Sequence, residues 1–185
     1  MENNLRARLE EFPVIAAVRE CYFESALNSP AEVIFLLGGD IATIGEKITK
    51  THEKGKFIFV HIDLTDGIGK DKSAVRYLWT LGVDGIISTK SSLIKFSKEQ
   101  GLITVQRFFA YDSHGIKGIG EVVGNTNPDF IEIMPGVIGK ITEKFSKWEI
   151  PLISGGLIET KQEVTEALRC GAFAVSTGKE ELWYI

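Results

Sequence analysis

Two short apolar runs near the carboxyl terminus each end in residues with small side chains. The run "IPLIS" (150–154) is followed by Gly155 and Gly156, and the run "AFAVS" (172–176) is followed by "TG". Glycine lets a backbone approach an anion closely, and N–H groups at the start of a following helix bind phosphate oxygens. One such loop is weak evidence, because glycines also make ordinary tight turns, but the pair favours a phosphate site. Its expected residues are Ser154, Gly155, Gly156, Ser176, Thr177 and Gly178.

Five polar or charged side chains lie at or near the ends of other apolar runs. Asp63 and Glu132 can accept hydrogen bonds from hydroxyl groups, and His61 can donate or accept. Lys90 and Arg107 offer positive charge to an anion. With the phosphate loops, these residue types predict a site for a small polyol phosphate. Two alternatives stay open: Glu132 is a buried partner of Arg107 or Lys90 in a structural ion pair, and Lys90 is a solvated lysine in the first turn of a helix.

Other chemistries have less support in the sequence. No H-x-x-E-H motif and no Cys/His cluster is present, so we expect no transition-metal site, and a divalent ion at Asp63 and Glu132 is only weakly indicated. A retained Asp or Lys base would suit enolisation or lyase chemistry, yet no nucleophile, base and orienting group can be assembled. We therefore predict no catalytic residue and no cofactor. Cys21 and Cys170 are far apart, and we expect both to be reduced packing thiols.

Length, composition and charge describe an ordinary globular chain. Its 185 residues, 44% of them hydrophobic and 25% charged, predict one domain over 1–185. The net charge of −4 provides no overall positive field for nucleic acid or membrane, so a polyanionic partner needs a local basic patch. The amino terminus lacks an apolar signal segment, and no apolar run approaches the ~20 residues that span a bilayer. We expect a cytoplasmic protein without membrane contact.

The elements that must position these side chains alternate in type along the chain. Short runs rich in Val, Ile and Phe predict strands, and the longer amphipathic stretches between them predict helices. Such an alternation is typical of parallel strands joined by helical crossovers, and the strand count favours a small TIM-type (β/α)8 barrel. The predicted strands are 13–18, 32–37, 56–62, 84–88, 102–109, 129–134, 150–154 and 172–176. The clearest predicted helices are 40–55, 72–82, 91–101 and 160–171.

The barrel prediction agrees with the predicted phosphate site, because such folds often bind phosphate in their last two strand-to-helix loops. In the helix over 160–171, Thr160 and Glu163 are spaced as a capping box, and Gly171 is placed to end the helix. The first crossover, over 19–31, is the one that we expect to be shortest. The segment 114–124 is rich in glycine, which leaves the shape of the helix after the fifth strand open.

Six segments, in order along nearly the whole chain, resemble a known family. They are "VHIDLTDGIG", "DGIISTKSSLIK", "GLITVQRFFAYDS", "DFIEIMPGVI", "IPLISGGLIETKQEV" and "GAFAVSTGKEELW". The combination of "STKSSLIK", "QRFF", "IMPG" and "GGLI" is specific, and it is similar to the glycerol-3-phosphate-responsive antiterminators that regulate bacterial glycerol uptake operons. The resemblance implies a (β/α) barrel that acts as a sensor and not as an enzyme. It implies glycerol 3-phosphate as the effector and a leader mRNA as the partner, so that transcription of a glycerol catabolism operon continues past a terminator.

No common RNA-binding motif supports the RNA partner from the residues themselves. If RNA binds, the glycine- and lysine-rich loops after the middle strands make Lys70, Lys72, Lys117 and Lys140 the expected contacts. Lysines on outer helices, such as Lys47, Lys50, Lys54 and Lys56, are the second choice, and lysine clusters of either kind are usually just a solvated face. Two other functions stay open: a sugar-phosphate enzyme of the barrel class, and a metabolite sensor whose partner is a protein. A homodimer is also left open.

Overall fold

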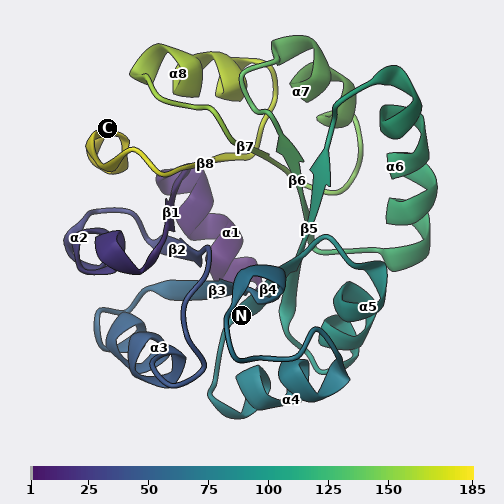
Figure 1. The fold of residues 1–185 in the computed structure, drawn as a ribbon. Coiled ribbons are helices and arrows are strands. Elements are labelled where there is room, and N and C mark those ends of the chain that lie inside the picture. Colours follow the sequence, from purple (N-terminus) through teal and green to yellow (C-terminus); the bar gives the residue numbers. More distant parts are fainter. Residues whose placement is uncertain (1) are drawn as a thin grey trace.

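A computed structural model describes residues 2–185, which form a closed barrel of parallel strands surrounded by helices (Figure 1). Each strand pairs with the next along the chain, and β8 returns to pair with β1. The strands are β1 (Val14–Val18), β2 (Val33–Leu36), β3 (Phe57–His61), β4 (Gly85–Ser88), β5 (Ile103–Phe109), β6 (Phe130–Met134), β7 (Leu152–Gly155) and β8 (Ala174–Thr177). This architecture confirms the predicted TIM-type (β/α)8 fold.

Helices connect the strands on the outside of the barrel. The α-helices are α1 (Glu2–Glu11), α2 (Phe23–Asn28), α3 (Ile44–Glu53), α4 (Lys72–Thr80), α5 (Ser91–Glu99), α6 (Ser113–Thr126), α7 (Gly139–Phe145) and α8 (Lys161–Arg169). The 3-10 helices are η1 (Glu20–Tyr22), η2 (Ile62–Leu64) and η3 (Glu180–Tyr184). The first crossover is short, as predicted, because it contains only η1 and the six-residue α2. The glycine-rich segment after β5 nevertheless forms the 14-residue α6.

The capping box of α8 is present as predicted. Thr160 Oγ1 accepts a hydrogen bond from the backbone N–H of Glu163 at 3.2 Å, and Glu163 Oε2 accepts one from the backbone N–H of Thr160 at 2.9 Å. The two interactions satisfy N–H groups that a helix start otherwise leaves unpaired. They also set the point at which the loop after β7 turns into a helix, and this loop borders the site described below.

The amino-terminal helix α1, which we did not predict, closes one end of the barrel. It lies behind the barrel centre in Figure 1, and its Leu5 and Leu9 are buried among the inward-facing apolar side chains of the strands. The guanidinium of Arg6 lies 5.3 Å from the ring centroid of Phe130. Because α1 covers the end at which the strands begin, the barrel interior opens toward the end at which they finish.

The two cysteines differ in exposure. Cys170 is buried, but Cys21 is exposed in η1, so the prediction of a packing thiol was wrong for Cys21; both thiols are free. Among the helices formed by residues 2–185, none combines the length and the apolar character needed to cross a membrane.

Candidate functional site

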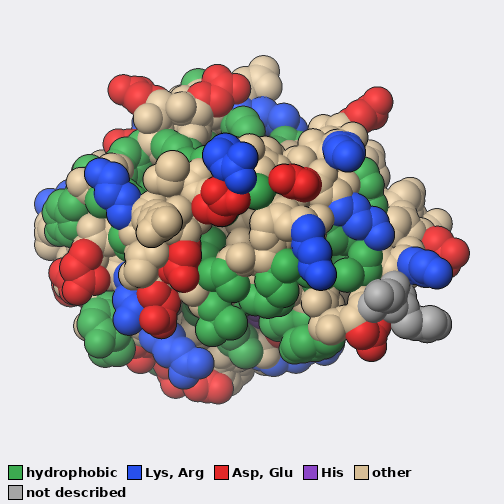
Figure 2. Space-filling view, turned by 90° about the horizontal axis from the view of Figure 1, so that it is seen from above, with side chains coloured by type: hydrophobic (Ala, Val, Ile, Leu, Met, Phe, Trp, Pro, Cys, Tyr) green, Lys and Arg blue, Asp and Glu red, His purple; other side chains and the backbone are tan. Residues whose placement is uncertain are grey.

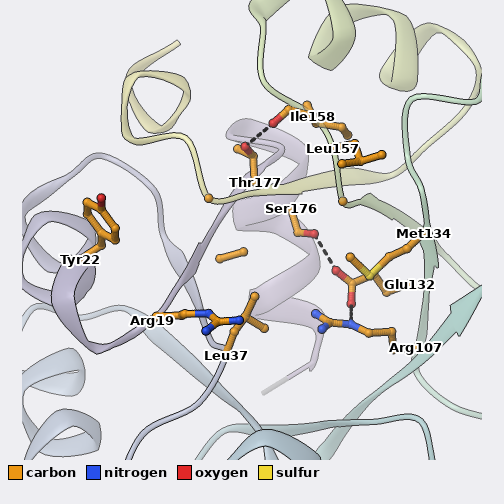
Figure 3. Close-up of a pocket in the computed structure, with 13 residues that line it drawn as sticks. Arg19, Tyr22, Leu37, Arg107, Glu132, Met134, Leu157, Ile158, Ser176 and Thr177 are labelled. Carbon is orange, nitrogen blue, oxygen red and sulfur yellow. Dashed lines mark hydrogen bonds and ion pairs between the residues drawn. The ribbon is translucent and has the colours of Figure 1, made fainter.

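A cavity of about 310 Å³ lies at the carboxyl-terminal mouth of the barrel (Figure 3). Its walls come from the ends of β1, β2, β5, β6, β7 and β8 and from the loops that follow several of them. The lining residues are Ala17, Arg19, Tyr22, Leu37, Arg107, Glu132, Met134, Gly156, Leu157, Ile158, Ser176, Thr177 and Gly178. The mouth of the barrel is where enzymes and binding proteins of this fold place their ligands.

A buried polar network forms the floor of the cavity. Arg107 Nε donates to Glu132 Oε2 at 2.5 Å, and Ser176 Oγ donates to Glu132 Oε1 at 2.6 Å. Arg107 and Glu132 are direct partners in the β5–β6 register, which places their side chains next to each other. Glu132 is fully buried and Arg107 nearly so. Glu132 therefore forms the structural ion pair with Arg107 that was one of the two interpretations. The pair leaves little net charge on the floor of the cavity.

Gly155 is required by this network. A β-carbon on Gly155 would lie 2.4 Å from Ser176 Oγ and 2.5 Å from Glu132 Oε1, closer than real contacts allow. Gly156 follows with φ +76°, a conformation that glycine adopts without strain. The backbone N–H of Gly136 donates to the carbonyl oxygens of Gly155 at 2.6 Å and Gly156 at 3.1 Å. The loop after β6 thus holds the loop after β7 in place.

The two glycine loops meet at the cavity and leave backbone donors free. Thr177 Oγ1 donates to the carbonyl oxygen of Ile158 at 2.7 Å, which joins the end of β8 to the loop after β7. Within the described chain, the backbone N–H groups of Gly156, Leu157 and Gly178 donate to no protein acceptor. Free N–H groups in glycine loops at a cavity wall are the donors that a phosphate group uses.

Positive charge converges on the cavity from two sides. Figure 3 shows Arg19 and Arg107 pointing toward each other, one from the end of β1 and the other from β5. Arg107 is neutralised by Glu132, whereas Arg19 has no ion-pair partner among residues 2–185. The guanidinium of Arg19 is therefore the positive charge available to an anion here, and guanidinium groups bind phosphate through paired N–H donors.

His61 lies at the end of β3, two residues after the inward-facing Phe59, with only 3% of its surface exposed. Its Nδ1 atom has no hydrogen-bond partner in the described structure. Burial, and then the positive charge of Arg107, lower the pKa of His61 to about 4. The imidazole is therefore neutral at pH 7, so one ring nitrogen is a donor and the other an acceptor.

Five of the predicted site residues are not among those that line the cavity: His61 and Gly155, which are described above, and Asp63, Lys90 and Ser154. Asp63 accepts hydrogen bonds from Ser88 Oγ at 3.0 Å and from the backbone N–H of Thr89 at 2.7 Å, so it fastens η2 to the end of β4. Lys90 is exposed at the start of α5, in agreement with the solvated-lysine alternative. The hydroxyl of Ser154 lies 3.2 Å from Thr142 Oγ1 in α7, because side chains alternate along β7 and that of Ser154 faces the helix layer. These three side chains are therefore not part of the cavity wall.

The sequence prediction also missed part of the cavity wall. Seven lining residues were not among the predicted site residues: Ala17, Arg19, Tyr22, Leu37, Met134, Leu157 and Ile158. For Arg19 a signal existed, because it directly follows the first strand, as the other predicted residues follow theirs. The other six carry no charge that would have singled them out, and only the closed barrel brings them together. Among residues 2–185, no group of three or more His, Cys, Asp or Glu side chains is arranged to hold a metal ion.

The four lysines predicted to contact RNA fall into two pairs. Lys70 Nζ donates to the carbonyl oxygens of Ile62 at 2.9 Å and Thr65 at 2.6 Å, and Lys72 Nζ lies 4.9 Å from the ring centroid of Phe96. These two are engaged within the protein. Lys117 and Lys140 are exposed, and neither has an ion-pair partner in the described part of the chain.

Three of the four lysines that were the second choice are engaged within the protein, and Lys54 has no ion-pair partner in the described part of the chain. Lys47 pairs with Glu20 at 2.7 Å, Lys50 pairs with Glu46 at 2.9 Å, and Lys56 Nζ donates to the carbonyl oxygen of Ala26 at 3.1 Å. On the face shown in Figure 2, basic and acidic side chains are interspersed without a continuous basic patch. A partner that needs positive charge therefore meets no continuous basic surface on this face.

Comparisons with known proteins identify relatives of this chain. The family model for the glycerol-3-phosphate responsive antiterminator matches residues 14–183. The Escherichia coli protein YgcP is 36% identical over 181 residues, which cover 95% of this chain and 93% of that protein. The crystal structure of a glycerol uptake operon antiterminator regulatory protein from Listeria monocytogenes is similar, with a TM-score of 0.88 and 31% identity over 93% of this chain and 95% of that one.

A second solved structure, a glycerol uptake operon antiterminator-related protein from Thermotoga maritima, has a TM-score of 0.83 and 30% identity, over 92% of this chain and 96% of that one. An aldolase, QR15, shares the fold with a TM-score of 0.73 at only 11% identity, over 93% of this chain and 92% of that one. The likeness to the aldolase concerns the fold alone. The chain belongs to the glycerol-3-phosphate responsive antiterminator family.

Proposed function

We propose that this protein is a ligand-gated regulator of a glycerol catabolism operon. It binds glycerol 3-phosphate in the cavity at the barrel mouth and then binds the leader mRNA, which promotes transcription antitermination. Family membership supports the regulatory role. The choice of ligand is supported by one observation: unpaired backbone N–H groups and the unpaired Arg19 converge on one small cavity.

The phosphate group of the ligand lies against Gly156, Leu157 and Gly178 in this proposal, with Arg19 opposite. Glu132 does not repel the anion, because Arg107 and Ser176 occupy its carboxylate oxygens. A phosphate bound by Arg19 and backbone donors gains charge-assisted hydrogen bonds in a partly enclosed site. The cavity of about 310 Å³ is at the small end of the range for ligand sites, which suits a three-carbon phosphate.

The glycerol hydroxyl groups face the polar floor. The oxygen of Ser176 has acceptor capacity left after donating to Glu132, and the remaining N–H groups of Arg107 are donors. His61 lies in the same inward-facing layer, with an unpaired ring nitrogen. No lysine among the described residues lines the cavity, so a Schiff-base mechanism has no nucleophile there. We therefore favour a sensor over a sugar-phosphate enzyme.

Thermal unfolding with glycerol 3-phosphate, glycerol and inorganic phosphate tests the ligand. Ligand at 100 times its dissociation constant adds about 2.7 kcal/mol to the free energy of unfolding. We expect this from glycerol 3-phosphate and not from glycerol. Arg19→Gln should lose the effect, whereas Arg169→Gln, at an exposed arginine of α8, should keep it. Equal stabilisation by glycerol and its phosphate contradicts the assignment, and consumption of glycerol 3-phosphate during incubation identifies an enzyme.

A gel shift with the leader transcript of the source organism's glycerol uptake operon tests the second half of the proposal. The protein should retard this RNA more strongly when glycerol 3-phosphate is present, because a regulator needs coupling between its two ligands. Unchanged mobility with and without the ligand, at protein concentrations that saturate the ligand site, contradicts the proposal.

A further inference from the structure

Exposed apolar side chains gather around the cavity mouth. Tyr22, Leu64, Val137 and Leu157 are exposed in the loops after β1, β3, β6 and β7. Single exposed apolar residues are ordinary, but a set distributed around one opening indicates a contact surface. The loop after β5 carries the most distinctive part of this rim.

Phe109, the last residue of β5, and Tyr111, in the loop that follows, form a stacked pair. Their ring centroids are 5.4 Å apart, and the planes of the rings differ by only 3°. Phe109 is 41% exposed and Tyr111 is 82% exposed. Tyr111 therefore presents most of its ring to solvent, held parallel to the ring beneath it, which is the geometry of a platform on which a further flat ring can stack.

The pair is joined directly to the cavity wall. Phe109 is the register partner of Met134, and the backbone N–H of Ala110, which lies between the two aromatic residues, donates to the carbonyl oxygen of Met134 at 2.8 Å. The side chain of Met134 lines the cavity. A ligand that changes the position of Met134 thus acts on the backbone that carries both rings.

Two lysines without an ion-pair partner in the described part of the chain come after the Phe109–Tyr111 pair in the sequence. The helices after β5 and β6 carry the exposed Lys117 and Lys140 near their starts, where a barrel helix lies close to the mouth. Aromatic faces together with unpaired lysines are the features that bind single-stranded nucleic acid, because bases stack on the rings while phosphates contact the cations.

We propose that the Phe109–Tyr111 pair is the platform on which an unpaired base of the bound RNA stacks. This inference rests on the proposed function, because it names the surface that the leader mRNA contacts. The pair lies beside the ligand cavity without lining it, so RNA contacts the rim while glycerol 3-phosphate occupies the interior. Truncating the exposed ring should therefore weaken RNA binding and leave ligand binding unchanged.

Equilibrium binding of the fluorescein-labelled leader transcript, with glycerol 3-phosphate at saturation, tests this platform. Tyr111→Ala should bind RNA about 5- to 150-fold more weakly, the range for one lost stacked base. Tyr111→Phe keeps the ring and should bind as the wild type does. Trp79→Ala is the matched control, because Trp79 is 52% exposed in the last turn of α4, at the other end of the barrel wall.

The outcomes separate this inference from the proposed function. No RNA binding by the wild type overturns both. Wild-type RNA affinity in Tyr111→Ala, with the wild type binding normally, overturns the platform alone. Unchanged RNA affinity together with lost antitermination in a purified transcription reaction shows that the rings contact the polymerase, which also overturns the RNA assignment. Calorimetric titration with glycerol 3-phosphate, without RNA, should give the same affinity for all of the variants.

Discussion

Four polar side chains interrupt an otherwise apolar barrel interior just beneath the cavity. His61, Arg107, Glu132 and Ser176 follow inward-facing apolar residues on their strands. Burying a charge is costly unless it is paired and hydrogen-bonded, and the Arg107–Glu132 pair with its Ser176 bond meets both conditions. The same positive charge of Arg107 contributes to keeping His61 neutral. In the proposed complex, the layer therefore supplies hydrogen-bonding groups to glycerol 3-phosphate without presenting a net negative charge to the phosphate.

The depressed pKa of His61 predicts a specific loss of stability in acid. An unfolded histidine has a pKa near 6.5, whereas that of His61 in the folded protein is about 4. Between these values the unfolded state binds a proton that the folded state does not, so the free energy of unfolding falls as the pH falls. From pH 7 to pH 5, His61 alone accounts for about 2 kcal/mol.

Urea denaturation of the wild type and His61→Gln at both pH values measures this contribution. The variant should lose about 2 kcal/mol less than the wild type over the interval, since all other titrating groups are common to the two proteins. Parallel losses in the two proteins would show that His61 is not held neutral by its surroundings.

At the scale of elements, local sequence signals predicted the barrel well. Strands that are buried on both faces read as continuous apolar runs, and the Thr160–Glu163 capping box is local by nature, so both were visible in the sequence. Helix α1 escaped prediction because it has only two buried leucines among charged residues. Its helical state depends on the open barrel end that Leu5 and Leu9 fill, and that end exists only after distant strands have closed.

The site was less predictable than the fold because side-chain direction decides it. Ser154 and Ser176 each come near the end of an apolar strand beside glycine, yet one faces the helix layer and the other the cavity. Successive side chains along a strand point to opposite faces, so an error of one residue in the position of a strand reverses which of its side chains are assigned to the cavity. Asp63 was likewise indistinguishable from a ligand contact until the structure showed its bonds to Ser88 and Thr89. The glycine loops could be predicted because glycine indicates accessible backbone N–H groups, which do not depend on the direction of a side chain.

Gly155 in β7 and Gly124 in α6 should respond in opposite ways to alanine. In Gly155→Ala the new methyl group overlaps Ser176 and Glu132, so we expect a loss of about 1–3 kcal/mol and weaker binding of glycerol 3-phosphate. In Gly124→Ala nothing lies within 4 Å of the new group, and the helix gains about 0.5–1 kcal/mol. Urea denaturation and calorimetric titration measure both effects. A Gly155→Ala protein as stable as the wild type would contradict the packing described around the network.

At the scale of the whole molecule, the two ends of the barrel have different roles. The end at which the strands begin is closed by α1, and the end at which they finish carries the cavity, the free backbone donors and the aromatic rim. The net charge of −4 gives no general attraction for RNA. In the proposed complex with RNA, the exposed Lys117 and Lys140 are the cations near the mouth that have no ion-pair partner in the described part of the chain.

Charge reversal at Lys117 and Lys140 should therefore weaken RNA binding without affecting the ligand. Each lysine that contacts a phosphate of single-stranded RNA contributes about 0.7 to the slope of log affinity against log salt concentration, so the double variant should lose about 1.4. Its affinity for glycerol 3-phosphate, measured without RNA, should equal that of the wild type, because neither lysine lines the cavity. Lys54→Glu, at the carboxyl end of α3, is the matched control and should retain the wild-type slope.

The same titrations measure the coupling that a regulator requires. If glycerol 3-phosphate raises RNA affinity by some factor, RNA must raise the affinity for glycerol 3-phosphate by that same factor, and 5- to 150-fold is the usual range. The double variant should keep this factor, because it loses phosphate contacts in the presence and in the absence of ligand alike. A factor that falls to one in the variant would mean that the ligand acts by ordering Lys117 and Lys140 themselves. An unchanged RNA affinity would place the RNA on another face of the barrel, with Lys54 then the first residue to reverse.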